Sequence, residues 1–409
     1  MTADSLDVRL NDHKVGTITA LGGDRSIFSF DDAYADDPNR PTLSLAFKGE
    51  HGGLLREHNP TQTKLLPFFS NLLPEGSLRD YLAKRAGVKA VREYPLIEVL
   101  GPDLPGAITI KPAGAGVVGD EDDLTDDETH RPNTEKPLRF SLAGVQLKFS
   151  AVEKARGGLT IPASGKGGDW IVKLPSARFR GVAANEFSMM SLAREMGLDV
   201  PAVELVPLDK IEGLPEGIGK LEEQEAFAVR RFDRTEDGGR IHIEDFAQVF
   251  GVYPDDKYEK GTYRHIAKVL WLETGEAGIR EFIKRLVFNA LIGNADMHLK
   301  NWSLIYPDGR TPQLSPGYDF VSTTVYIPDD SAGLRFARTK RVAELTLDEI
   351  AYMAAKAGAP EALAVDAATE MVDRFREVWG RERAHLPIAK DLEAEVESLL
   401  NVVPLASSR

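Results

Sequence analysis

The spacing of hydrophobic positions changes several times along the chain, and each change predicts a different kind of element. Residues 5–60 contain short segments in which apolar and polar residues alternate between Gly, Asn and Asp turns, a pattern typical of half-buried strands. Residues 61–90 place their apolar side chains on one face of a predicted helical segment, and residues 96–112 return to a strand pattern. Residues 5–60 therefore predict a small β-rich module, which a helical segment and a further strand follow.

The rest of the chain changes from strands to helices. Residues 138–232 are strand-rich and contain one predicted helix, from Val182 to Met196. From residue 243 onward the apolar spacing becomes helical. Thr346 and Glu349 have the spacing of a capping box, which predicts the start of a further helix.

The composition is that of a folded chain with several domains. Its 409 residues are 42% hydrophobic, enough to bury a sizeable core in two or three domains. The absence of cysteine excludes disulfides, zinc–thiolate sites and thiol nucleophiles, and the eight histidines are scattered rather than spaced as metal ligands. No apolar stretch approaches the ~20 residues of a membrane helix, and the first residues lack the features of a signal peptide. We therefore expect a cytoplasmic protein without membrane association.

Charge adds two constraints. The formal net charge of −14 argues against binding nucleic acid over the whole surface, although a local basic patch stays open. Seven acidic residues gather between 120 and 128. Because like charges repel and stay hydrated, this run predicts a flexible linker or an exposed loop.

Three polar residues have the spacing of a phosphotransferase catalytic loop. Asn301 follows Asp296 by five residues, and Asp319 comes after a strand-sized gap. In protein kinases the first Asp accepts the proton of the substrate hydroxyl, and the Asn and the later Asp hold magnesium. Mg²⁺ prefers hard oxygen ligands and takes one or two from the protein. The spacing therefore predicts Asp296 as the catalytic base and Asn301 and Asp319 as metal ligands.

The surroundings of this motif favour the same interpretation. Residues 282–292 form an apolar run with helical spacing, whereas residues 302–306 alternate like a strand and lead into a turn at 307–310. Asp296 and Asn301 are thus expected in a polar loop between a buried helix and a hairpin. A D-x4-N pair alone is a weak signal, and a solvated loop without catalytic function is the alternative.

The wider pattern resembles the HipA family of toxin kinases. The resemblance rests on blocks that occur in the right order between about residue 67 and residue 323: Asn71–Gly76, Gly101–Ala107, Ser141–Lys148, Trp170–Pro175, Asn185–Phe187, Val229–Arg234, His242–Gln248, Gly293–Ser303 and Leu314–Thr323. It implies an α+β, two-lobed protein-kinase-like fold, with a β-rich N-terminal lobe, a helical C-terminal lobe and a small N-terminal β-rich accessory subdomain. We accordingly divide the chain into this accessory subdomain (1–118), an acidic linker or loop (119–136), a nucleotide-binding lobe (137–235) and a helical catalytic lobe (236–409).

The resemblance also implies cofactors and site residues. Ser141–Lys148 resembles the family's phosphate loop, and ATP and Mg²⁺ are the implied cofactors. Ser141 is implied to be an autophosphorylation site whose modification expels this loop and switches the enzyme off. The residues implied to contact the nucleotide or its phosphates are Ala143, Gly144, Val145, Gln146, Lys148, Lys173, Glu186, Arg230, Phe232, His298, Lys300 and Tyr318.

Some of these residues are also singled out by their context. Lys173 is a lone charge in an apolar strand, which is costly unless it is paired, and Glu186 in the next helix is the candidate partner. A solvent-facing lysine and a solvated helix carboxylate are the alternatives. Arg230 stands where the family commonly has an acid in its hinge, but the hinge holds adenine chiefly through backbone groups. Phe232 is a candidate to stack near the base or to pack in the core.

The biological role comes from the resemblance alone. It implies the toxin of a toxin–antitoxin module that phosphorylates a protein serine, with an aminoacyl-tRNA synthetase as target. A HipB-like helix-turn-helix antitoxin is the implied partner, and operator DNA is expected to bind mainly through it. Two alternatives stay open, a small-molecule kinase on the same fold and a non-catalytic co-repressor. Any direct contact with DNA is expected from surface arginines such as Arg374, Arg376, Arg381 and Arg383.

Overall fold

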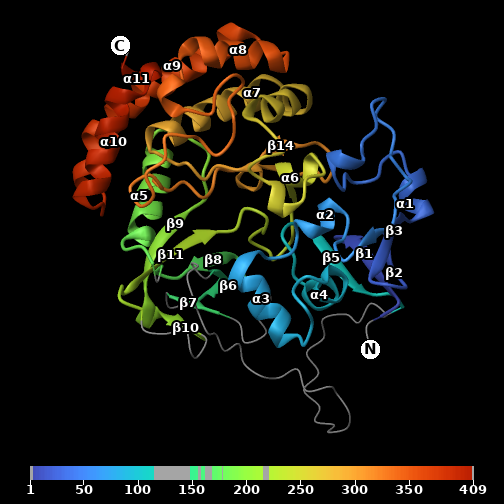
Figure 1. The fold of residues 1–409 in the computed structure, drawn as a ribbon. Coiled ribbons are helices and arrows are strands. Elements are labelled where there is room, and N and C mark those ends of the chain that lie inside the picture. Colours follow the sequence, from blue (N-terminus) through green and yellow to red (C-terminus); the bar gives the residue numbers. More distant parts are fainter. Residues whose placement is uncertain are drawn as a thin grey trace.

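The computed structural model describes residues 3–114, 148–154, 158–161, 168–176, 178–214 and 221–407. These residues form an N-terminal module, a sheet-based lobe and a helical lobe that lie against one another (Figure 1). The acidic run at 120–128 lies outside the described residues. No helix in the described part of the chain is both long and apolar enough to cross a membrane.

The N-terminal module is built on a five-stranded antiparallel sheet with the order β4-β3-β2-β1-β5. Its strands and helices are β1 (Ser5–Leu10), β2 (His13–Leu21), β3 (Arg25–Phe30), α1 (Asp32–Asp36), β4 (Thr61–Gln62), α2 (Pro67–Ser70), α3 (Gly76–Arg85), α4 (Glu93–Leu100) and β5 (Ile108–Pro112). Alternation along β1 buries Leu6, Val8 and Leu10 on one face. The strand predicted at 96–112 is therefore wrong in its first part, because Leu96 and Ile97 belong to α4, and short apolar runs do not distinguish helix from strand.

The second lobe contains a six-stranded sheet with the order β10-β7-β6-β8-β11-β9. Its elements are β6 (Lys148–Glu153), β7 (Leu159–Thr160), β8 (Trp170–Lys173), α5 (Val182–Glu195), β9 (Val203–Pro207), β10 (Ile211–Glu212) and β11 (Glu225–Arg230). The predicted helix is α5, and it ends before Gly197, whose φ is +82°. The buried face of α5 joins the core of the helical lobe, so this helix ties the two lobes together.

The helical lobe follows, but it does not begin with a helix. Residues 242–245 form β12, which pairs with β13 (Ser303–Tyr306) and through it with β14 (Gln313–Leu314). The helices are α6 (Phe246–Val249), α7 (Tyr263–Leu291, kinked at Gly275), α8 (Leu347–Ala357), α9 (Glu361–Glu382), α10 (Lys390–Val402) and α11 (Pro404–Ser407). The helical pattern predicted from residue 243 therefore begins only after β12, whereas the predicted hairpin at 307–310 is confirmed.

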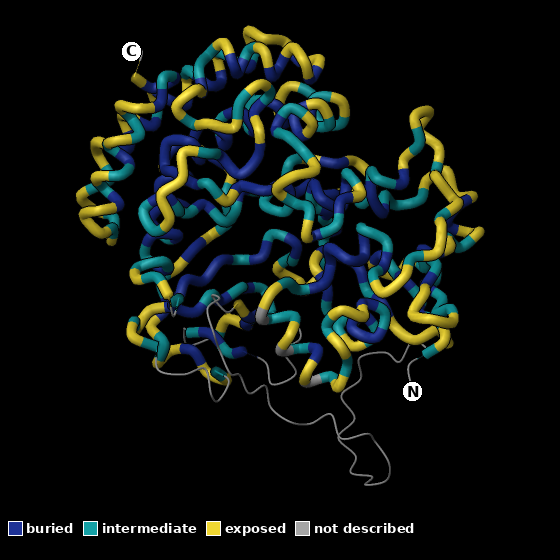
Figure 2. Tube along the Cα trace, viewed as in Figure 1, coloured by how far each residue is buried: buried dark blue, intermediate teal, exposed yellow. Residues whose placement is uncertain are grey.

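Burial follows this division, with dark-blue buried segments concentrated inside each region in Figure 2. The largest core packs α7, α8 and α9 together. The capping box expected at the start of α8 forms only in part. The Thr346 hydroxyl accepts the Glu349 N–H at 3.1 Å, but the buried Glu349 carboxylate instead accepts the backbone N–H groups of Ala337 and Arg338. This fastens the 337–338 turn to the helix.

Candidate active site

The loop that contains Asp296 is held in place by the chain that follows Asp319. Gly293 has a φ of +69°, and a Cβ there would lie 2.2 Å from the Thr324 hydroxyl, so only glycine fits this turn. The Gly293 carbonyl accepts the N–H groups of Thr323 and Thr324 at 3.0 and 3.1 Å. The loop between α7 and β13 is therefore held together with the segment after Asp319 as one unit.

Asn294 joins this loop to Asp319 directly. Its amide donates to the Asn289 side chain at 2.9 Å and to the Asp319 carbonyl at 3.0 Å, while its Oδ1 accepts the Asp296 N–H at 3.2 Å. The residue is almost fully buried, as expected of a side chain whose polar atoms are satisfied. Sequence reasoning assigned Asn294 no role, and only its place in the Gly293–Ser303 block marked it.

Asp296 and Asn301 face each other across the loop. The Asn301 Nδ2 donates to the Asp296 carbonyl at 2.8 Å, which leaves the Asn301 Oδ1 available to a cation. The Asp296 carboxylate accepts a hydrogen bond from the hydroxyl of Tyr258. A carboxylate that accepts a hydrogen bond from one hydroxyl group is suited to orient the hydroxyl group of a substrate in the same way.

Lys173 at the end of β8 is paired with two carboxylates. Its ammonium lies 2.6 Å from the Glu186 carboxylate on α5 and also contacts the Asp319 carboxylate. Although burial works against it, Asp319 and Glu186 raise the pKa of Lys173, so it stays protonated. The structure thus brings together a strand, a helix and a loop that lie up to 146 residues apart in sequence.

Asp319 is held in an unusual conformation and stays ionised. Its φ is +56°, in the left-handed region that few residues other than glycine adopt. Although burial opposes ionisation, the charges of Lys173 and Lys148 lower the pKa of Asp319 to about 2. Lys148 is directly opposite Lys173 in the antiparallel pair of β6 and β8, so both side chains project from the same face of the sheet. Two lysines that face an ionised aspartate are suited to bind a phosphate group together with its metal ion.

The described residues contain no cluster of three or more His, Asp or Glu side chains that by itself could hold a metal. A Mg²⁺ ion at this site would therefore need the oxygens of Asn301 and Asp319 together with those of a bound phosphate. Mg²⁺ commonly binds in this way at nucleotide sites. The donor set fits such an ion, since both side chains supply hard oxygen ligands.

The other predicted site residues lie in different environments. His298 is buried, its pKa is lowered by burial to about 4, and its ring packs edge-on against Tyr258 at 4.9 Å. Tyr318 is 5.7 Å from the Phe232 ring, and its hydroxyl is 2.6 Å from that of Ser303. Arg230 is half-exposed and pairs with Glu236 at 3.4 Å.

Lys300 differs most from its expected surroundings. Its ammonium donates to the Asn71 carbonyl at 2.8 Å and lies 3.4 Å from the carboxylates of Glu75 and Asp245. Asn71 and Glu75 belong to the N-terminal module, which therefore reaches the catalytic loop. Glu75 also pairs with Lys257 at 2.7 Å.

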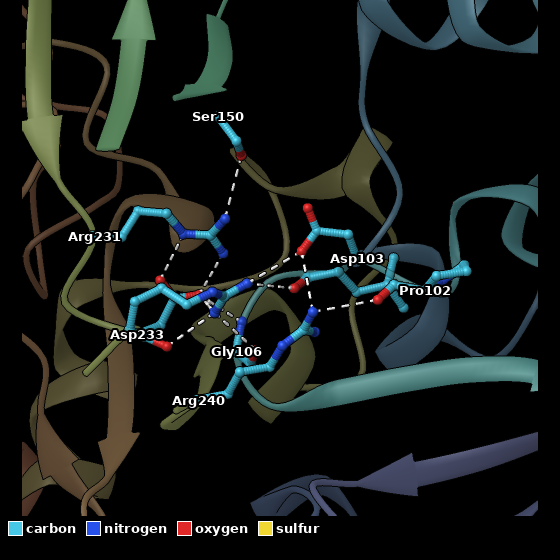
Figure 3. A network of polar contacts seen from close by, with 9 residues as sticks. Pro102, Asp103, Gly106, Ser150, Arg231, Asp233 and Arg240 are labelled. Atoms are coloured by element: carbon cyan, nitrogen blue, oxygen red, sulfur yellow. Dashed lines mark hydrogen bonds and ion pairs between the residues drawn. The ribbon is translucent and has the colours of Figure 1, made fainter. Parts of the chain in front are cut away.

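A second contact fastens the N-terminal module to the segment after β11 (Figure 3). Asp233 pairs with the guanidinium groups of Arg231 and Arg234 at 2.7 and 2.8 Å, and it accepts the Gly106 N–H at 2.8 Å. The Asp103 carboxylate forms ion pairs with the guanidinium groups of Arg234 and Arg240 at 3.3 and 3.4 Å. The Gly101–Ala107 and Val229–Arg234 blocks of the sequence thus lie side by side.

Part of the predicted site lies outside the described residues: Ser141, Ala143, Gly144, Val145 and Gln146. Sequence reasoning also overlooked several side chains that the structure brings to the catalytic loop. Asn71 and Glu75 stood in a block that had no assigned function, and this block was their only signal. Lys257 and Tyr258 carried no sequence signal at all.

Known proteins share sequence with this chain over most of its length. The family described as HipA-like C-terminal domain matches residues 140–379, and the HipA N-terminal domain matches residues 6–111. Y4dM of Sinorhizobium fredii, which is named as a kinase, is 55% identical over 403 residues, which cover 98% of this chain and 97% of that protein. The serine/threonine-protein kinase toxin HipA of Shewanella oneidensis is 28% identical over 364 residues, covering 79% of this chain and 76% of the relative.

A solved structure matches nearly the whole chain. It is that of the Shewanella oneidensis toxin–antitoxin system of HipA, HipB and their operator DNA, with a TM-score of 0.74 at 23% identity over 99% of this chain and 97% of that one. At this identity the match concerns the fold. The predicted two-lobed kinase-like fold with an N-terminal accessory module is therefore confirmed.

Proposed function

This chain is a kinase that belongs to the HipA family, and we propose that it transfers the γ-phosphoryl group of ATP to a serine of a protein. The observation that carries the proposal is the Lys173 ammonium, which joins Glu186 and Asp319 beside the loop of Asp296 and Asn301. Kinases require a lysine held by a helix carboxylate and a metal-binding aspartate to be in place together. The arrangement supports phosphoryl transfer more directly than it supports a non-catalytic co-repressor.

In the proposed mechanism Asp296 orients the acceptor hydroxyl. The hydroxyl oxygen attacks the γ-phosphorus, the bond from that phosphorus to the oxygen of ADP breaks, and the hydroxyl proton passes to the Asp296 carboxylate. Lys173 and Lys148 hold the phosphates from the sheet side. Asn301 and Asp319 would hold Mg²⁺, which supplies neutralising charge to the phosphates when it is bound. Ser141 is proposed as the site of autophosphorylation that switches the enzyme off, because its block resembles the family's phosphate loop and a phosphate adds roughly −1.5 to −2 charge.

We also propose that the chain acts as the toxin of a toxin–antitoxin pair, with an aminoacyl-tRNA synthetase as target. A HipB-like antitoxin is the proposed partner, supported by the solved complex of a family relative with HipB and operator DNA. The net charge of −14 supports DNA binding mainly through the antitoxin. The arginines considered for direct contact are engaged within the chain: Arg374 with Glu377, Arg376 with the Ala406 carbonyl, Arg381 with Glu382, and Arg383 with Glu393 and Glu397.

The substitution Asp296→Asn tests the proposed reaction. Asparagine still accepts the Tyr258 hydrogen bond but cannot take the proton, so the transfer rate should fall by ~10²–10⁴ while the fold is kept. The measurement is incorporation of labelled phosphate from ATP and Mg²⁺ into the full-length chain and into candidate synthetases. Asp366→Asn, which changes an exposed aspartate on α9, is the matched control and should keep wild-type activity. Near-normal transfer by the Asp296 variant would refute the assignment, and transfer only to small molecules would favour a small-molecule kinase.

A further inference from the structure

The Asn71–Gly76 block places one carboxylate of the N-terminal module between two lysines of the helical lobe. The Glu75 carboxylate lies 2.7 Å from the Lys257 ammonium and 3.4 Å from that of Lys300. Lys300 directly precedes Asn301 in the catalytic loop, and Lys257 directly precedes Tyr258, whose hydroxyl contacts Asp296. Glu75 thus lies where its charge acts on both sides of the loop.

The two lysines are not held equally. Lys300 keeps the Asn71 carbonyl at 2.8 Å, the Asn71 Oδ1 at 3.1 Å and the Asp245 carboxylate at 3.4 Å, with or without Glu75. For Lys257, Glu75 is the sole ion-pair partner among the residues that the structure describes. Removing the charge of Glu75 therefore releases Lys257 and leaves Lys300 in place.

A released Lys257 has an acceptor nearby. Its ammonium lies 5.7 Å from the centre of the Tyr258 ring, and Tyr258 in turn donates to Asp296. Partial desolvation raises the pKa of Asp296, whereas the Tyr258 hydrogen bond and the charge of Lys257 lower it, which places Lys257 within electrostatic reach of this carboxylate. A lysine has a long, flexible stem and a compact charge, which lets it change partners.

Pairing with Lys257 would obstruct the reaction. An acceptor hydroxyl can replace the Tyr258 hydroxyl by exchanging one neutral donor for another. Both donors bond an ionised carboxylate, but the ammonium adds the attraction of a full opposite charge, so a neutral hydroxyl would not displace it easily. Such a pair would also oppose transfer of the proton to Asp296.

We propose that Glu75 is a positioning residue that holds Lys257 away from Asp296 and so keeps the Asp296 carboxylate free for the acceptor hydroxyl. The inference rests on the proposed function of Asp296 as the base. It makes the N-terminal module part of the active site, because catalysis then depends on the position of a carboxylate that this module supplies.

A double-mutant cycle tests the proposal with the full-length chain. Glu75→Gln and Glu75→Ala are each made alone and together with Lys257→Met, and ADP release and phosphate incorporation are measured with ATP and Mg²⁺. In the wild-type background, loss of Glu75 should lower kcat on the order of 10²-fold, the low end of the effect of losing a general base, with little change in KM for ATP. In the Lys257→Met background the same change should lower kcat by less than about threefold, because the cycle isolates the coupling between the two residues.

Lys64→Ala is the matched control. Lys64 belongs to the N-terminal module and pairs at 2.6 Å with Asp255, two residues before Lys257, so its loss breaks an ion pair between the same two regions without touching Glu75. It should leave kcat unchanged. An equal loss from Glu75 substitution in both backgrounds would overturn the inference and indicate a purely structural role. An inactive wild-type chain would instead refute the proposed function, so the two failures are distinguishable.

Discussion

Two of the polar junctions between the N-terminal module and the kinase lobes differ in construction. At the hinge junction the Asp233 side chain is 7% exposed and is shared by two arginines and the Gly106 N–H (Figure 3). At the catalytic-loop junction the Glu75 side chain is 34% exposed and stands between two lysines. Both junctions pair acids with bases, yet only the first is buried.

The difference in burial suggests different roles: the buried junction holds the module in place, whereas the partly exposed junction can change its contacts. A buried charge is tolerated only when several partners satisfy it, and removing one of them leaves the others unpaired. A partly exposed ion pair contributes little to stability because water competes for both groups. The hinge junction should therefore control whether the module stays docked. The catalytic-loop junction should control whether Lys257 is held away from the Asp296 carboxylate.

Breaking the hinge junction should have the largest effect on stability. Asp233→Asn leaves buried Arg231 without a carboxylate and Arg234 with Asp103 alone, which we expect to lower the free energy of unfolding by about 3–5 kcal/mol. The shift is measured by urea denaturation followed by circular dichroism. Glu75→Gln in the same assay should cost less than about 1 kcal/mol. Equal costs for the two variants would contradict the distinction between the junctions.

A third contact, between the module and β12, should make docking sensitive to acid. The His242 ring bonds the Leu43 carbonyl at 2.8 Å, and burial lowers the pKa of His242 to about 4. The unfolded chain, with a pKa near 6.5, binds the proton first, so this contribution to stability is complete above that pH and is lost as the pH falls toward 4. The slope is at most about 1.4 kcal/mol per pH unit.

His242→Gln isolates this effect. Unfolding free energies of wild type and variant are compared at pH 7.5, 6 and 5, and their difference should shrink as the pH falls. Burial raises the pKa of the neighbouring Glu244 to about 7, so its own contribution is lost as the pH rises from about 4.5 to 7. That opposite trend is present in both proteins and cancels in the difference. Parallel pH curves would show that His242 does not titrate in this way.

The smallest effect is expected from an exposed link between the same regions. Lys48 pairs with Glu273 at 2.7 Å, but the lysine side chain is 44% exposed. Lys48→Ala should change the free energy of unfolding by about 0.2–1 kcal/mol, reduced further by added salt, and should leave kcat unchanged. A loss near that of Asp233→Asn would mean that burial does not distinguish the attachments.

Much of the kinase core could be predicted from local pattern. The apolar run before Gly293, the polar loop and the following hairpin were readable because helix, turn and strand each leave a local signature. The same logic failed at 96–112, where α4 and β5 share a short apolar stretch, and at β12, whose alternation was hidden beside a helical region.

The sequence by itself determined the family, through its ordered blocks, and the types and spacing of Asp296, Asn301 and Asp319 predicted the kind of chemistry. Only the tertiary structure decided which groups act on one another. Glu75 meets Lys257 across 182 residues, and Asp233 meets Gly106 across 127. Contacts over such separations depend on how whole regions of the chain pack together. The residues next to a charged side chain in the sequence therefore do not indicate which distant partner it will pair with.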